Sequence, residues 1–311
     1  MSRAAPGEEP GLHPATLAID IGGTGLKASV LGADGRLLAD RVRVVTPYPC
    51  PPDRLIDTLA ALVAPLPPSD RASAGFPGVV RKGKVLTAPH FVTQSGPGSP
   101  VVADLMKAWT GFDLAGSLRK RLGVPTRVAN DADLQGWAVV SGKGLEMVVT
   151  LGTGVGTALF MDGKLAPHLE LAHHPFRKGE TYNEQIEDAA LRQIGRKKWR
   201  ERVLEAIANF ATLVNYDHLY VGGGNARHMV GHVSGPITIV DNVAGILGGI
   251  RLWETDSHWE HRPVGRRRPS PSPLLEPEPD PAAGAAPAAV GAASSRKAPA
   301  GRSRGAGRPA D

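Results

Sequence analysis

The chain has 311 residues, of which 41% are hydrophobic and 21% charged, and its formal net charge is +6. This composition supports one large domain or two lobes with substantial cores, and the charge selects neither nucleic acid nor an anionic substrate. The single cysteine, Cys50, excludes an intrachain disulfide and a cysteine-based zinc cluster. Because neither an apolar leader nor a long apolar run occurs, we expect a cytoplasmic protein without a membrane-spanning helix.

The chain divides by composition into an arm, two lobes, a helix and a tail. We expect residues 1–14 to be a disordered arm, 15–127 an N-terminal α/β lobe and 128–241 a C-terminal α/β lobe. Residues 242–253 are predicted to form a helix that packs back on the N-terminal lobe. The tail, 254–311, is rich in Pro, Ala and Arg and has few large apolar residues, so we expect disorder there.

The first apolar segment, "LAIDIGGTGLKASV" over residues 17–30, contains a glycine turn with the G-x-G-x-x-A spacing of a dinucleotide site. In such a site the turn leads into a helix. Here a second strand and an Asp-Gly turn follow, so we predict a β-hairpin. Asp20 lies directly before the turn, where it would repel phosphate unless a cation lay between them. The segment therefore indicates a Mg²⁺-polyphosphate site, and the alternative is a plain hairpin turn.

Apolar residues at helical spacing alternate along the chain with shorter apolar runs that end in glycine-rich or polar loops. This alternation predicts an α/β fold. Helices are predicted over 53–66, 111–123, 184–215 and 242–253, and strands over 71–80, 125–131 and 217–224.

Residues 147–166, "MVVTLGTGVGTALFMDGKLA", repeat the pattern of residues 17–38. Each copy is a strand, a glycine-threonine turn, a second strand and an Asp-Gly turn, and Gly readily takes the positive φ that tight turns need. Two distant copies of one β-meander predict two similar lobes. Two such hairpins can clamp phosphate from opposite sides of a cleft.

Polar residues follow the strand near residue 128 in "VANDADLQG". One interpretation is capping of the next helix by Asn or Asp, and this is the whole role we consider for Asp133. The functional interpretation makes Asp131 a general base that takes a proton from a sugar hydroxyl. Asn130 would contact a hydroxyl of the same sugar.

"PHLELAHHP" places Glu170 and His173 near each other, with His168 and His174 beside them. An acceptor and a switchable donor suit hydroxyl recognition, whereas the alternative is packing and surface histidines. Gly78, in "GFPGVV", is either a simple turn or part of the wall of the sugar pocket.

Two further segments have weaker signals. Gly222, Gly223 and Gly224 follow a strand, where they allow either a tight turn or close approach by a phosphate chain. The basic stretch "GRKKWRERV", residues 195–203, is best interpreted as a solvated helix face. Its alternative is a track for a long anionic donor.

The motifs together resemble the ROK family of repressors and sugar kinases, most closely its polyphosphate- and ATP-dependent glucokinases. The resemblance implies an actin-like (ribonuclease H-like) two-lobed fold, and transfer of a phosphoryl group from polyphosphate or ATP to the 6-hydroxyl of glucose. It implies Mg²⁺ near Asp20, held through water, no zinc, Asp131 as general base, and a homodimer without specific nucleic acid or membrane partners. Sugar contacts are implied for Asn130, Glu170, His173 and Gly78, and phosphate contacts for Asp20, Gly22, Gly23, Thr24, Lys27, Gly152, Thr153, Gly154, Gly222, Gly223 and Gly224.

The chain departs from the family pattern at several positions. Ala172 stands where Gly is usual, and we expect its methyl group to crowd the sugar pocket. His90 replaces an expected Asn, and Glu187 stands where Gly is frequent. The alternative function is a catalytically weak, sugar-binding sensor or regulator. A repressor's N-terminal helix-turn-helix is not expected, because about 16 residues precede the first strand.

Overall fold

The computed structural model describes residues 14–240 and 244–254. All the described residues belong to one compact unit. The arm and tail predicted to be disordered lie outside the described residues, apart from Pro14 and Glu254.

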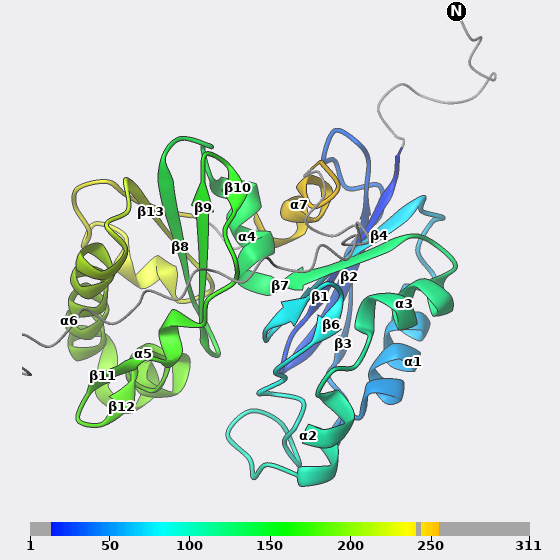
Figure 1. Ribbon diagram of the computed structural model, residues 1–311, viewed down its shortest axis with the longest axis horizontal. Helices are drawn as coiled ribbons and strands as arrows, with labels where there is room; N and C mark the ends of the chain where they lie inside the picture. Colours follow the sequence, from blue (N-terminus) through cyan, green and yellow to red (C-terminus); the bar gives the residue numbers. More distant parts are fainter. Residues whose placement is uncertain (1–13, 241–243, 255–311) are drawn as a thin grey trace, which may run out of the picture. The chain divides into compact units, whose positions relative to one another are not determined.

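The first sheet has five strands in the order β3-β2-β1-β4-β7 (Figure 1). β1 pairs with β2 antiparallel and with β4 parallel, so a hairpin is followed by parallel crossovers. The predicted hairpin at residues 17–30 is therefore confirmed, and the dinucleotide interpretation is excluded. The strands are β1 (Thr16–Ile21), β2 (Gly25–Leu31), β3 (Val42–Val45), β4 (Arg71–Phe76) and β7 (Thr126–Asn130), with a separate β5 (Val80–Arg81) and β6 (Lys84–Val85) pair.

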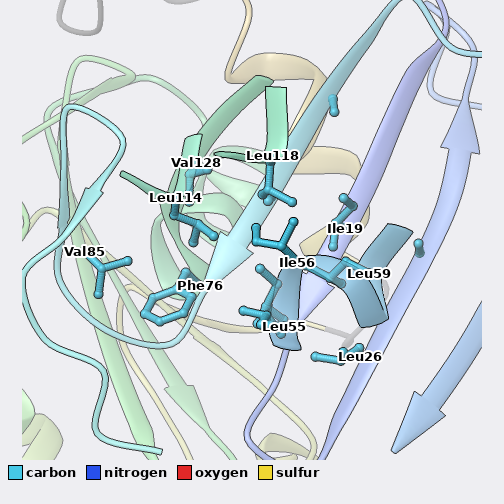
Figure 2. Close-up of a cluster of buried hydrophobic side chains, with 14 of the residues drawn as sticks. Ile19, Leu26, Leu55, Ile56, Leu59, Phe76, Val85, Leu114, Leu118 and Val128 are labelled. Carbon is cyan, nitrogen blue, oxygen red and sulfur yellow. The ribbon is translucent and has the colours of Figure 1, made fainter. Parts of the chain in front are cut away.

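Both faces of this sheet are buried. Successive side chains of a strand point to opposite faces, so Ile19 and Ala18 of β1 belong to different clusters. Ile19 packs with the helices α1 (Pro52–Val63) and α3 (Leu114–Leu122). Figure 2 shows this core, whose labelled members are Ile19, Leu26, Leu55, Ile56, Leu59, Phe76, Val85, Leu114, Leu118 and Val128.

The second sheet repeats the connectivity of the first, in the order β10-β9-β8-β13-β14. β8 pairs with β9 antiparallel and with β13 parallel, just as β1 pairs with β2 and β4. At the second Asp-Gly turn, Asp162 and Gly163 both have positive φ, 50° and 74°, as a tight hairpin turn requires. The strands are β8 (Leu145–Leu151), β9 (Val155–Met161), β10 (Lys164–Leu165), β13 (His218–Gly222) and β14 (Ile237–Ile239).

The helical pattern at residues 184–215 is interrupted twice. It forms α5 (Tyr182–Ile186) and α6 (Asp188–Val214), separated by Glu187 in extended conformation. Gly195 then leaves helical geometry at φ 76°, ψ 159°. The prediction of a single helix is therefore wrong. The apolar spacing continues across both breaks, so it did not reveal them.

The remaining elements are shorter. They are α2 (Ala103–Trp109), β11 (Pro175–Arg177), β12 (Glu180–Thr181), and the 3₁₀ turns η1 (Leu171–His173) and η2 (Ala226–Met229).

Two helices, α4 (Asp131–Val139) and α7 (Ala244–Arg251), pack against each other between the sheets. α7 contacts β1 and β4, and α4 contacts β8 and β9. The backbones of α4 and α7 lie close together, because a Cβ at Gly248 would collide with the Leu134 backbone. Ser73 fixes the end of α7 by donating to the Gly249 carbonyl (2.6 Å) and accepting from Trp253 Nε1 (2.8 Å).

The architecture confirms the predicted α/β class with an actin-like arrangement of two similar sheets. Within residues 14–240 and 244–254, no helix has the length and apolarity needed to cross a membrane.

Candidate active site

One cleft, with a volume of about 440 Å³, collects nearly all the residues singled out in the sequence. Both glycine hairpins, the β7–α4 junction and the segment around η1 contribute to its walls. Of the predicted site residues, only Gly222 does not line it; a Cβ there would meet Val240 instead. The predicted residues that line the cleft are Asp20, Gly22, Gly23, Thr24, Lys27, Gly78, Asn130, Asp131, Gly152, Thr153, Gly154, Glu170, His173, Gly223 and Gly224.

The first glycine hairpin is held from outside the cleft. Gly22 N donates to the Gly25 carbonyl at 3.1 Å, which closes the turn. Hydroxyl groups bind the turn's own carbonyls: Thr46 Oγ1 donates to Gly22 (2.6 Å) and Tyr48 to Gly23 (2.7 Å). The turn is thereby fixed by partners that sequence reasoning did not identify.

The second glycine hairpin is closed by Gly152 N donating to the Gly154 carbonyl at 2.9 Å. Asn183, at the start of α5, accepts from Val155 N at 2.8 Å and donates to the Glu187 carboxylate at 2.7 Å. Glu187, which had no role in the sequence analysis, therefore orients the amide that supports this hairpin.

Asp131 is the first residue of α4 and lies in the cleft. Burial raises the pKa of its carboxyl to about 7, and the negative charges of Asp20, Glu170 and Asp133 add to the effect. The Ala132 backbone N–H, which donates to Asp131 Oδ1 at 2.9 Å, opposes the rise. A carboxyl with a pKa near neutrality is well matched to proton transfer at neutral pH.

Asn130 is the residue that caps α4. Its Oδ1 accepts from Ala132 N (2.8 Å) and Asp133 N (3.4 Å), and its Nδ2 donates to the Gly78 carbonyl (3.1 Å). One Nδ2 hydrogen remains for a ligand. A side chain at Gly78 would run into the Thr87 carbonyl, so the carbonyl bound by Asn130 needs glycine.

Asp133 does not cap the helix, contrary to the capping interpretation. Its side chain is 4% exposed and its Oδ1 lies 2.9 Å from His168 Nδ1. The ring of His168 extends toward Glu170, whose Oε1 is 3.4 Å from Nε2. Glu170 in turn lies 3.8 Å from His173 Nε2.

Two residues that differ from the family pattern, Ala172 and His90, lie in different parts of the structure. Ala172 is fully buried in the second core and does not line the cleft. The expected crowding by its methyl group is therefore wrong, because the methyl points into the core. His90 does line the cleft and packs on Gly23, where a Cβ would lie 2.8 Å from the ring. Burial and then the charge of His173 lower the pKa of His90.

Asp20 and Lys27 face each other across the first hairpin, as direct partners of β1 and β2. Lys27 Nζ lies 3.0 Å from Asp20 Oδ2, and both side chains are about two-fifths exposed. The pair therefore remains open to solvent and to a ligand in the cleft.

Sequence reasoning missed several polar residues of the lining, among them Asp188 and Asn225. Asn225 Nδ2 donates to Asp188 Oδ1 at 3.1 Å, and Arg192 lies 2.8 Å from Asp188 Oδ2. Asp188 N donates to the Gly152 carbonyl, so this cluster borders the second glycine hairpin.

Basic side chains follow Asp188 along α6. Arg196 and Arg200 are four residues apart, which places them on one helix face, whereas Arg192 precedes the bend at Gly195. Burial lowers the pKa of His228, and the charges of Arg227, Arg196 and Arg200 lower it further. We call Arg192, Arg196, Arg200 and Arg227 the basic strip.

Comparison with known proteins shows which proteins this chain is similar to. Residues 16–167 match the model of the ROK family. The polyphosphate glucokinase of Mycobacterium tuberculosis is 29% identical over 223 residues, which cover 67% of this chain and 77% of that protein. The N-acetylmannosamine kinase of Escherichia coli is 36% identical over 156 residues, 48% of each protein.

Among solved structures, the inorganic polyphosphate/ATP-glucomannokinase of Arthrobacter sp. strain KM is similar, with a TM-score of 0.66 and 28% identity. The match covers 77% of this chain and 98% of that one. Nearly the whole of that enzyme's fold is therefore present here.

Proposed function

Because the chain carries a ROK family domain, we propose that it is a kinase that transfers a phosphoryl group from polyphosphate or ATP to the 6-hydroxyl of glucose. The observation that carries the proposal is the position of Asp131. Its carboxyl, with a pKa raised to about 7, shares one cleft with two glycine hairpins of the same design.

We assign each part of the phosphoryl transfer to residues that line the cleft. Asp131 accepts the hydroxyl proton as the sugar oxygen forms a bond to phosphorus, and the bond from phosphorus to the donor's bridging oxygen breaks. Asn130, Glu170 and His173 orient the sugar through its other hydroxyls. Backbone N–H groups of the two glycine hairpins face the phosphoryl oxygens, where they stabilise developing charge.

Mg²⁺ would neutralise the donor's charge when bound. Within residues 14–240 and 244–254, no group of three or more His, Cys, Asp or Glu is arranged to hold a metal. This fits Mg²⁺, which keeps several waters and usually binds through one or two carboxylates plus substrate phosphates. The proposal assigns this role to Asp20, through water, and its partly exposed carboxylate beside Lys27 supports the assignment.

The basic strip supports polyphosphate as a donor. A long polyanion that leaves the cleft past Asp188 would meet Arg192 and then the remainder of the strip. ATP has only three phosphates and ends in a nucleoside, so it would contact fewer residues of the basic strip. Polyphosphate use should therefore depend on the strip, and on ionic strength, more than ATP use does.

The test is a coupled assay of glucose, mannose and N-acetylmannosamine, each with ATP and with long-chain polyphosphate. We expect glucose turnover that chelation abolishes and Mg²⁺ restores. The double variant Arg196→Ala, Arg200→Ala should raise the KM for polyphosphate about tenfold or more and that for ATP much less. The control is Arg119→Ala, Lys120→Ala, the same loss of charge on the exposed part of α3.

Sugar binding without turnover of any hexose would support the alternative, a sensor or regulator. Equal effects of the α6 variant on both donors would remove the argument for polyphosphate. The homodimer stays a prediction that sedimentation would check.

A further inference from the structure

His168 is a buried histidine between two carboxylates, and the proposed mechanism does not use it. Its side chain is 5% exposed. Nδ1 lies 2.9 Å from Asp133 Oδ1, and Nε2 lies 3.4 Å from Glu170 Oε1. No closer partner of Nε2 occurs in the described part of the chain. Both ring nitrogens therefore face carboxylate oxygens.

This geometry indicates a charged ring. A neutral imidazole has one donor nitrogen and one acceptor nitrogen, and its acceptor would face a carboxylate. The doubly protonated ring donates to Asp133 and turns its second N–H toward the Glu170 carboxylate. Burial lowers the pKa of His168 and raises that of Asp133, and the hydrogen bond between the two side chains opposes both shifts. With the nearby charges of Asp133 and Glu170, the pKa of His168 rises to about 10.

Negative charge gathers where this ring lies. Asp20 from β1, Asp133 from α4 and Glu170 before η1 all act on Asp131. The other cationic or titratable groups are farther along: Lys27 pairs with Asp20, and His173 lies beyond Glu170 and acts on His90. His168 is the group that contacts two of the acids directly.

We infer that His168 is a positioning residue whose imidazolium orients the Glu170 carboxylate toward the sugar and offsets the negative charge gathered around Asp131. The inference rests on the proposed kinase function for its catalytic consequences. Asp133 then acts as the buried counter-ion that holds the ring in place.

The variant His168→Gln keeps a side-chain amide but removes the positive charge. We expect the sugar KM to rise about 10- to 100-fold, because Glu170 loses its orienting partner. The acid limb of the kcat/KM profile should also move to higher pH by about one unit, because Asp131 then holds its proton more tightly. His174→Gln, at a neighbouring exposed histidine outside the cleft, is the matched control.

The double variant Asp133→Asn, His168→Gln removes one negative charge together with the positive one. Its acid limb should return toward that of the wild type, whereas the sugar KM should stay high. A purely structural role of His168 would leave the acid limb of His168→Gln unchanged, and that result would overturn the inference.

A measurement on the wild-type protein needs neither turnover nor variants. In ¹⁵N-histidine NMR, His168 should show two protonated ring nitrogens at about pH 8, where an ordinary histidine is neutral. A neutral His168 ring at that pH would overturn the inference. If the ring is charged but no hexose is phosphorylated, the proposed function fails and the charge assignment stands.

Discussion

Replacing Asp131 by Asn separates the cost of burying this carboxyl from its use in catalysis. The pKa of Asp131 rises from an ordinary value of 3.8 to about 7 in the folded chain. The folded state therefore holds the proton more tightly than the unfolded state between these values. It follows that this group lowers the free energy of unfolding as pH rises from about 4 to about 7, with no further change above.

The magnitude follows from the shift of about three pKa units, which corresponds to ~4 kcal/mol at most. Asp131 is partly exposed in the cleft, so solvent screens some of this cost. We expect Asp131→Asn to be more stable than the wild type by about 1–3 kcal/mol at pH 8, and equal to it near pH 4. Turnover should fall by about 10²- to 10⁴-fold, since the amide cannot accept the proton.

The assay is urea unfolding of both proteins across this pH range, with sugar phosphorylation measured on the same samples. Asp104→Asn, at an exposed position in the first turn of α2, is the control for the carboxyl-to-amide change. A stability difference that does not vary with pH would refute the raised pKa. Near-normal turnover would remove Asp131 from the role of base.

Two predictions concern the supports of the cleft. In Gly23→Ala the new methyl would lie 2.8–3.0 Å from atoms of His90, so turnover should drop about tenfold or more; a His90→Ala background should lessen that loss, and an undiminished loss there would contradict the contact. Ser73→Ala removes the hydrogen bonds to Gly249 and Trp253 and should lower the free energy of unfolding by about 1–3 kcal/mol. Urea unfolding followed by tryptophan fluorescence measures this, and a loss below about 0.5 kcal/mol would show that the two bonds do not stabilise the end of α7.

The two hairpins were predictable because their signals are local. A glycine turn between apolar runs, followed by Asp-Gly, specifies a meander from neighbouring residues alone, and its repetition at residues 147–166 indicated the second sheet. The lining of the cleft by Asp131, Glu170 and all the predicted glycines except Gly222 could be anticipated from the motifs.

Other features depend on contacts between distant segments, which the sequence does not display. Asn183 reaches the second hairpin across 28 residues and Thr46 reaches the first across 24. The direction of a short side chain is equally hidden. Asn130 and Asp133 are both good capping residues, but only Asn130 sits at the extended N-cap position, at φ −63° and ψ 150°.

Helical periodicity also gave a wrong prediction for α6, because it does not detect a bend. A bend at one glycine preserves the apolar spacing on either side, so residues 184–215 read as one helix although Gly195 has φ 76°. Ala172 shows the same limit, because a motif position does not say whether a methyl group faces the cleft or the core.

The packing of α7 has a consequence for synthesis of the chain. Ser73 binds Gly249, which lies 176 residues later, and Ala18 and Leu31 cluster with Ile250. At a ribosomal rate of about 5–20 residues per second, α7 emerges roughly 10–35 s after β4. During that interval one face of the first sheet lacks its cover, so the nascent protein exposes an apolar surface that the finished protein never shows.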